Sequence, residues 1–139
     1  MEKETYIWKI FYADDDKDDR NFFEHSVKKI SPNTSITLAK NGKEMLEILI
    51  GSKSKPDLIV LDMNMPCMDG FECLREIRKN KRLLSVPIVM LSTSNSTEHI
   101  QRAVAEKADR YYIKPGCLEE LFKTVQAMLT LINRKPTYL

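Results

Sequence analysis

The chain has 139 residues, which is the size of one ordinary domain. Apolar residues make up 42% of it and charged residues 30%, a balance typical of a folded globular protein and not of a disordered one. The formal net charge of +2 is too small to indicate nucleic acid or an anionic membrane as a partner.

No apolar run approaches the ~20 residues that a membrane-spanning helix needs, and residues 1–5 lack the hydrophobic core of a signal peptide. The sequence therefore predicts a cytoplasmic location without membrane attachment. Cys67, Cys73 and Cys117 are odd in number and show no CxxC spacing. We expect three reduced thiols, and neither a disulfide framework nor a structural zinc site.

Short apolar and β-branched runs predict five strands, at residues 6–13, 36–39, 58–61, 86–91 and 110–113. The run at 58–61 is apolar without interruption, as expected of a strand that is covered on both faces. A helical pattern follows each strand. This alternation predicts an α/β fold in which a parallel sheet lies between two helical layers.

Polar residues suited to begin helices precede three of the helical patterns. Asp16 and Ser96 are candidate N-caps, and Asn41 followed by Glu44 resembles a capping box. The last helix has one apolar stripe, which we expect to face the core: Leu118, Leu121, Phe122, Val125, Met128, Leu129 and Ile132. Residues 133–139 read as a short polar tail.

Ligands of open parallel sheets bind beyond the carboxyl ends of the strands, so the residues that follow each strand are informative. Residues 14–16 are three aspartates after the first strand, and Asp62 follows the third. Residues 92–94 are hydroxyl-bearing and follow the fourth strand, and Lys114 follows the fifth. The predicted fold brings these groups to one edge of the sheet.

This combination predicts phosphoryl chemistry on an aspartate. Crowded carboxylates repel one another and call for a cation, and oxygen ligands without His or Cys favour Mg²⁺. A lysine keeps a neighbouring carboxylate ionised and nucleophilic, and with a hydroxyl it can hold phosphoryl oxygens. Each piece alone has an ordinary explanation, such as a helix cap or a turn, but the four in this order favour a site.

Four segments of the chain resemble those of a response regulator receiver domain: ADDD at 13–16, PDLIVLDMNMPCMDG at 56–70, PIVMLSTS at 87–94 and YYIKP at 111–115. The resemblance spans residues 7–131. It implies a flavodoxin-like fold, with a five-stranded parallel sheet of order 2-1-3-4-5 and helices on both faces. Since a receiver would occupy nearly all of residues 1–139, we expect a stand-alone, single-domain regulator.

The resemblance also implies residue roles. Asp62 would accept a phosphoryl group from the phosphohistidine of a sensor histidine kinase. Asp14 and Asp15 would hold Mg²⁺ together with Asp62 and the backbone carbonyl of Asn64. The downstream partner would be a target protein or a histidine phosphotransfer protein, and the chain would not be a turnover enzyme.

Three further residues take switch roles by the same resemblance. Lys114 would contact the phosphoryl group, Ser92 would move to meet it, and Tyr111 would be the coupled aromatic residue. Thr93 lies beside Ser92 and is left open as a residue that shares its role.

Departures from the family pattern concern loops. Cys67 stands where glycine is frequent, Gly116 follows the Lys-Pro pair, and Cys117 is a poor cap for the last helix. Residues 16–20 and 78–85 are similar to single-domain regulators paired with bacterial phytochrome-type kinases.

Three other functions fit these residues less well. A phosphatase of the haloacid dehalogenase type would carry a second Asp two residues after the first, where this chain has Asn64. A degenerate receiver that serves only as a scaffold would lack acidic, acceptor or lysine residues. A flavin-binding protein of this fold would need a phosphate loop, and an Asp-rich loop repels phosphate.

Overall fold

The computed structural model describes residues 7–132, which form alternating strands and helices. The strands are β1 (Lys9–Ala13), β2 (Ser35–Ala39), β3 (Leu58–Leu61), β4 (Ile88–Ser92) and β5 (Arg110–Ile113). The helices are α1 (Lys17–Ile30), α2 (Gly42–Gly51), α3 (Gly70–Arg78), the 3-10 helix η1 (Lys81–Leu83), α4 (Thr97–Ala105) and α5 (Leu118–Leu129). The predicted tail at 133–139 and the start of the first predicted strand at Tyr6 lie outside the described residues.

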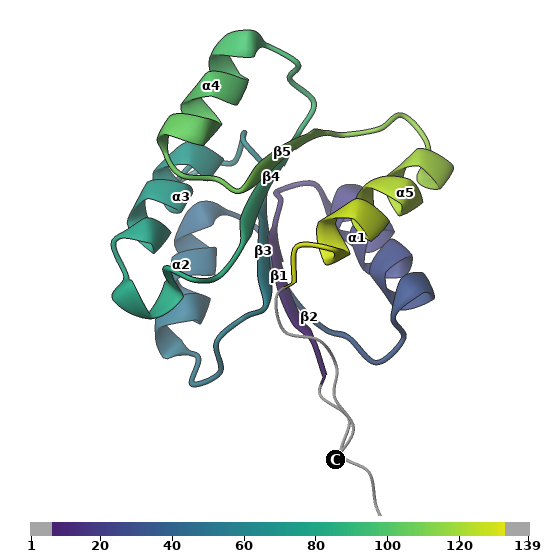
Figure 1. Ribbon diagram of the computed structural model, residues 1–139, viewed down its shortest axis with the longest axis horizontal. Helices are drawn as coiled ribbons and strands as arrows, with labels where there is room; N and C mark the ends of the chain where they lie inside the picture. Colours follow the sequence, from purple (N-terminus) through teal and green to yellow (C-terminus); the bar gives the residue numbers. More distant parts are fainter. Residues whose placement is uncertain (1–6, 133–139) are drawn as a thin grey trace, which may run out of the picture.

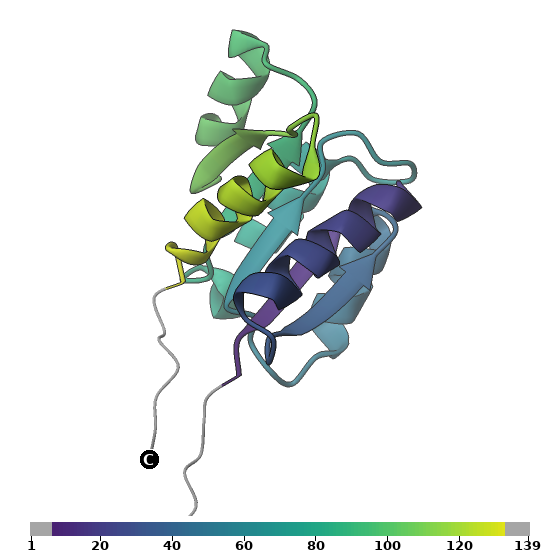
Figure 2. The same cartoon turned by 90° about the vertical axis from the view of Figure 1, so that its right-hand side faces the viewer.

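The five strands form one parallel sheet of order β2-β1-β3-β4-β5, which confirms the expected topology. Helices α2, α3 and α4 cover one face, and α1 and α5 cover the other (Figure 1). Seen from the second direction, α1 and α5 lie side by side over the sheet (Figure 2). Each strand therefore delivers its last residues to the same edge.

Alternate residues of β1 divide the core into two parts. Phe11 packs with the cluster under α2, α3 and α4, whereas Tyr12 packs with Phe23 and the cluster under α1 and α5. All four residues of β3 are buried, as a strand covered on both faces requires. Burial of each large side chain stabilises the fold by roughly 1.5–3 kcal/mol.

Side chains cap the helices largely as predicted. Asp16 accepts the N–H of Asp19, and Ser96 caps α4. The predicted capping box at Asn41 is wrong in its second half. Asn41 accepts from Glu44, but the Glu44 carboxylate accepts the backbone N–H of Lys40, one residue before the cap. The turn into α2 brings the N–H of Lys40 to the Glu44 carboxylate, whereas a capping box would use the N–H of Asn41.

The apolar stripe of α5 is only partly buried. Val125, Met128, Leu129 and Ile132 lie in the core, whereas Leu118 in the first turn is 48% exposed. The prediction of a core stripe is therefore wrong for the first turn, because that turn borders a cavity beside α1 instead of packing against it. Cys117 makes no side-chain cap, as expected.

The fourth strand is displaced from its predicted limits. It begins at Ile88 because the N–H of Val86 donates to the carbonyl of Leu83 in a turn that closes η1. It extends to Ser92, which pairs with Ile113 of β5. Within residues 7–132, no helix combines the length and the apolar character needed to cross a bilayer.

Candidate functional site

Two carboxyl groups follow β1 at the carboxyl edge of the sheet. Asp14 is fully buried, and its Oδ1 accepts the backbone N–H of Asp16 at 2.9 Å. The Arg20 guanidinium donates to the Asp14 carbonyl oxygen at 2.8 Å, which ties the strand end to α1. Asp15 is exposed. One carboxyl group is thus fixed in the protein, and its neighbour faces solvent.

Asp62 lies beside them, directly after β3. Its backbone N–H donates to the carbonyl of Ala13 at 2.9 Å, so the ends of the two central strands are in register. The residue is 6% exposed. A Cβ on Gly70 would lie 2.1 Å from the Asp62 carbonyl oxygen, so the start of α3 approaches this strand end as only glycine allows.

Lys114 reaches the same point from β5. Its backbone N–H donates to the Ser92 carbonyl at 2.7 Å. Its ammonium Nζ lies 2.8 Å from Asp14 Oδ2 and 3.3 Å from Asp62 Oδ1. It also lies 2.9 Å from Oδ2 of Asp19, in the first turn of α1. The predicted convergence of the aspartates and the lysine is therefore present.

The edge carries more negative than positive charge. Burial, and then the charge of Asp14, raise the pKa of Asp62 from 3.8 to about 7, although Lys114 opposes that rise. Burial pulls the pKa of Lys114 down, but hydrogen bonds to Asp14 and Asp19 outweigh it and raise the pKa. One ammonium does not balance the surrounding carboxyl groups, so the site favours a further cation.

Asp14, Asp15 and Asp62 each offer one oxygen, and these oxygens lie within 4.8 Å of one another. The set contains hard oxygen donors alone, with one exposed member through which an ion can enter, and this fits Mg²⁺. Asn64 is exposed in the loop after Asp62. That the backbone carbonyl of Asn64 binds the metal ion stays a prediction.

The hydroxyl and aromatic residues of the predicted switch meet at Ser94. Ser92 is 1% exposed, and its Oγ accepts the N–H of Ser94 at 3.1 Å. Tyr111 is half-buried on β5, and its hydroxyl donates to the Ser94 carbonyl at 2.7 Å. Thr93 is exposed. The switch roles of Ser92 and Thr93 stay predictions, and Ser94 is a hydrogen-bonded link between Ser92 and Tyr111 that sequence reasoning missed.

Sequence reasoning also missed Tyr12 and gave Asp19 no role. The Tyr12 hydroxyl donates to Asp14 Oδ2, and burial followed by the charge of Asp14 raises the pKa of this phenol. A tyrosine inside an otherwise apolar strand was the available signal. Asp19 gave none, because its approach to Lys114 depends on how α1 packs beside α5 and the segment that enters it.

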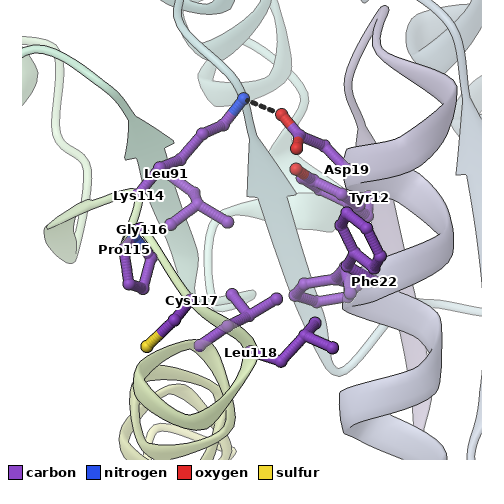
Figure 3. A pocket seen from close by; sticks show the side chains of 11 residues that line it. Tyr12, Asp19, Phe22, Leu91, Lys114, Pro115, Gly116, Cys117 and Leu118 are labelled. Carbon is purple, nitrogen blue, oxygen red and sulfur yellow. Dashed lines mark hydrogen bonds and ion pairs between the residues drawn. The ribbon is translucent and has the colours of Figure 1, made fainter.

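A cavity of about 320 Å³ opens next to the site, between α1 and the segment that enters α5. Lys114 and Asp19 face each other across one end of it, and Phe22 and Leu118 line the other end (Figure 3). Tyr12 lies at its wall. The charged site therefore continues into an apolar hollow on the α1 and α5 side.

Comparison with known proteins agrees with this geometry. Residues 10–126 match the model of the response regulator receiver domain. A probable methanogenesis regulatory protein, FilR2 of Methanothrix harundinacea, is 36% identical over 63% of this chain. The chain spans 59% of that relative's length.

Two solved structures cover nearly the whole chain. The phosphorylated cyanobacterial phytochrome response regulator RcpA matches with a TM-score of 0.85 and 28% identity, over 96% of this chain and 99% of that one. The Mn²⁺-bound response regulator Rcp1 matches with a TM-score of 0.81 and 26% identity, over 94% and 99%. Receiver domains are signalling switches that take phosphoryl groups from sensor histidine kinases. This chain belongs to the response regulator receiver domain family.

Proposed function

We propose that this chain is a cytoplasmic, phosphorylatable switch of a two-component system, in which Asp62 accepts a phosphoryl group from a histidine kinase. One observation carries the proposal. Asp62 is a nearly buried carboxyl group with an oxygen within 4.8 Å of oxygens of Asp14 and Asp15 and another contact, at 3.3 Å, to the ammonium of Lys114. The phosphorylated state of RcpA and the Mn²⁺ in Rcp1 support it by similarity.

In the transfer step, an Asp62 carboxylate oxygen forms the new O–P bond. The P–N bond of the phosphohistidine breaks, and its electron pair stays on the imidazole nitrogen, which takes a proton from water. Lys114 donates hydrogen bonds to the phosphoryl oxygens as negative charge gathers there. Bound Mg²⁺ would neutralise part of that charge, held by Asp14, Asp15, Asp62 and the carbonyl of Asn64.

The product stays covalently attached to Asp62, so the chain acts as a switch and not as a turnover enzyme. Loss of the phosphoryl group to water would reset it. Asn64 stands where a haloacid dehalogenase-type phosphatase would carry its general acid, and an amide cannot transfer that proton.

The output is a changed surface that controls a protein partner, either a direct target or a histidine phosphotransfer protein. A phosphoryl group adds roughly −1.5 to −2 charges and three acceptor oxygens. Ser92 would move toward these oxygens, and Tyr111 would take up the space that Ser92 leaves. The hydrogen bonds of both residues to Ser94 support this coupling, because motion of one disturbs the other.

The acceptor is tested with a small acyl phosphate and intact-mass spectrometry. We expect one phosphoryl group on the wild-type chain and none on Asp62→Asn. Asp18→Asn is the matched control, because Asp18 is exposed and lies in the first turn of α1. Undiminished labelling of Asp62→Asn would refute the assignment. Equal labelling of the wild-type chain with and without excess EDTA would refute the requirement for a metal ion.

The switch is tested by backbone NMR on addition of beryllofluoride and Mg²⁺. We expect large shifts across residues 103–114 in the wild-type chain and much smaller ones in Ser92→Ala. Equal shifts in both proteins would refute the coupling of Ser92 and Tyr111 and leave the phosphorylation chemistry intact.

A further inference from the structure

The ammonium of Lys114 contacts a third carboxylate that the phosphorylation chemistry does not use. Its Nζ lies 2.9 Å from Asp19 Oδ2, which is close to its 2.8 Å contact with Asp14. Its contact with Asp62 is the longest of the three, at 3.3 Å. Figure 3 shows Lys114 and Asp19 pointing toward each other from opposite sides of the cavity. In this state, Lys114 is closer to Asp14 and Asp19 than to Asp62.

The three carboxylates differ in how firmly they are held. The Asp14 and Asp62 side chains follow strand ends and are 0% and 8% exposed, whereas the Asp19 side chain lies on α1 and is 38% exposed. An ammonium has three N–H donors, and a phosphoryl group on Asp62 first takes the place of Asp62 Oδ1. A second contact with one of its three acceptor oxygens must then displace Asp14 or Asp19. Asp19 is the partner that water can replace most easily, because its carboxylate is already partly hydrated.

We propose that Asp19 is a positioning residue that holds Lys114 back while Asp62 is unphosphorylated and releases it when the phosphoryl group arrives. This inference rests on the proposed function. The pair with Asp19 is present in the resting state and is given up in the phosphorylated state. It therefore stabilises the resting state relative to the phosphorylated one.

The release has a structural consequence on the α1 side. Lys114 and Asp19 line the same cavity as Phe22 of α1 and Leu118 of α5, and both of these side chains are partly exposed. The ion pair ties α1 to the segment that enters α5. When it opens, the two walls of the cavity lose this tie, so the charge state of Asp62 is transmitted to α1.

The first test measures the affinity for beryllofluoride, a mimic of the phosphoryl group, in saturating Mg²⁺. We expect Asp19→Asn to bind it more tightly than the wild-type chain by about two- to five-fold, the range that a partly exposed ion pair provides. Asp18→Asn removes the same charge from the same turn. Asp18 is exposed and forms no ion pair within residues 7–132, so we expect wild-type affinity. Asp19→Glu restores the charge and should return the affinity toward wild type.

The second test follows the ¹⁵Nζ resonance of Lys114 without any activity measurement. In unliganded Asp19→Asn, we expect this resonance to shift from the wild-type resting position toward the beryllofluoride-bound position. Equal affinities of Asp19→Asn and Asp18→Asn, or an unmoved resonance, would overturn the inference alone. Failure of the wild-type chain to bind beryllofluoride would overturn the proposed function as well.

Discussion

Two cationic side chains gather oxygen atoms at opposite ends of the sheet, and they do so in different ways. Arg78 donates to the carbonyls of Leu83, Val86 and Lys107 at 3.3, 3.0 and 3.1 Å, where the chain enters β4 and β5. It pairs with one carboxylate, that of Asp109, at 2.9 Å. Its charge is thus matched by one opposite charge and by neutral carbonyl dipoles.

Lys114 lies at the carboxyl end of the sheet, where carboxylates surround its ammonium group. Asp14, Asp19 and Asp62 lie within 3.3 Å of its ammonium, and Asp15 lies beyond them. The Arg78 cluster is complete in itself, whereas the Lys114 cluster is short of positive charge. A partly buried charge therefore does not mark a functional site by itself. An unmatched excess of one sign does, because only that excess calls for a metal or a reactant.

The largest effect on stability is expected at the Arg78 cluster, where positive and negative charges balance. Arg78→Ala leaves several carbonyls without their donor, so we expect the free energy of unfolding to fall by about 3–5 kcal/mol in urea titration. Arg75→Ala is the control, because its pair with Glu106 is exposed, and we expect much less change. The folded fraction of Arg78→Ala should still take up a phosphoryl group at the wild-type rate. A slower rate would contradict the separation of the two ends.

The excess of carboxyl groups around Lys114 predicts that the stability of the metal-free chain, measured in EDTA, depends on pH. The pKa of Asp62 is raised in the native state to about 7 from 3.8, so the folded chain retains a proton that the unfolded chain releases in this window. Stability therefore falls as pH rises from 3.8 to about 7. We expect Asp62 to contribute a decrease of about 2–4 kcal/mol, measured as the difference between wild type and Asp62→Asn. Parallel stability curves for the two proteins would contradict it.

The smallest effect concerns backbone strain, which residues 7–132 show once near each end of the sheet. Cys67 near the site and Lys107 at the other end have positive φ values of 68° and 70°. Glycine adopts this conformation without a Cβ penalty, so Cys67→Gly and Lys107→Gly should each stabilise the fold by about 0.5–1 kcal/mol. Cys67→Ala should give no gain. An equal gain from Cys67→Ala would place the cost on the thiol and not on the backbone.

The sequence predicted the groups that are fixed to strand ends. Asp14, Asp62 and Lys114 follow strands that their apolar runs identify, so the parallel sheet alone brings them together. The sequence also showed that Cys67 stands where the family often has glycine. The positive φ of this residue explains why glycine suits the position.

Contacts that depend on helix packing were not predictable. Asp19 meets Lys114 because the first turn of α1 faces the segment between β5 and α5, and Arg78 meets Asp109 because α3 ends near the start of β5. Leu118 matches a core stripe in spacing, yet it is exposed because the first turn of α5 borders a cavity. Periodicity gives the face of a helix but not where along its length the neighbour makes contact.

A Mg²⁺ titration followed by thermal unfolding measures whether the carboxyl edge of the sheet lacks positive charge. Ligand binding to the native state alone stabilises it by about 1.4 kcal/mol at ten times the dissociation constant. We predict a Tm of the wild-type chain that rises with Mg²⁺ and a much smaller rise for Asp15→Asn, whose exposed side chain contributes to the site but not to the core. A wild-type Tm that does not respond to Mg²⁺, or an equal rise in both proteins, would contradict this lack of positive charge.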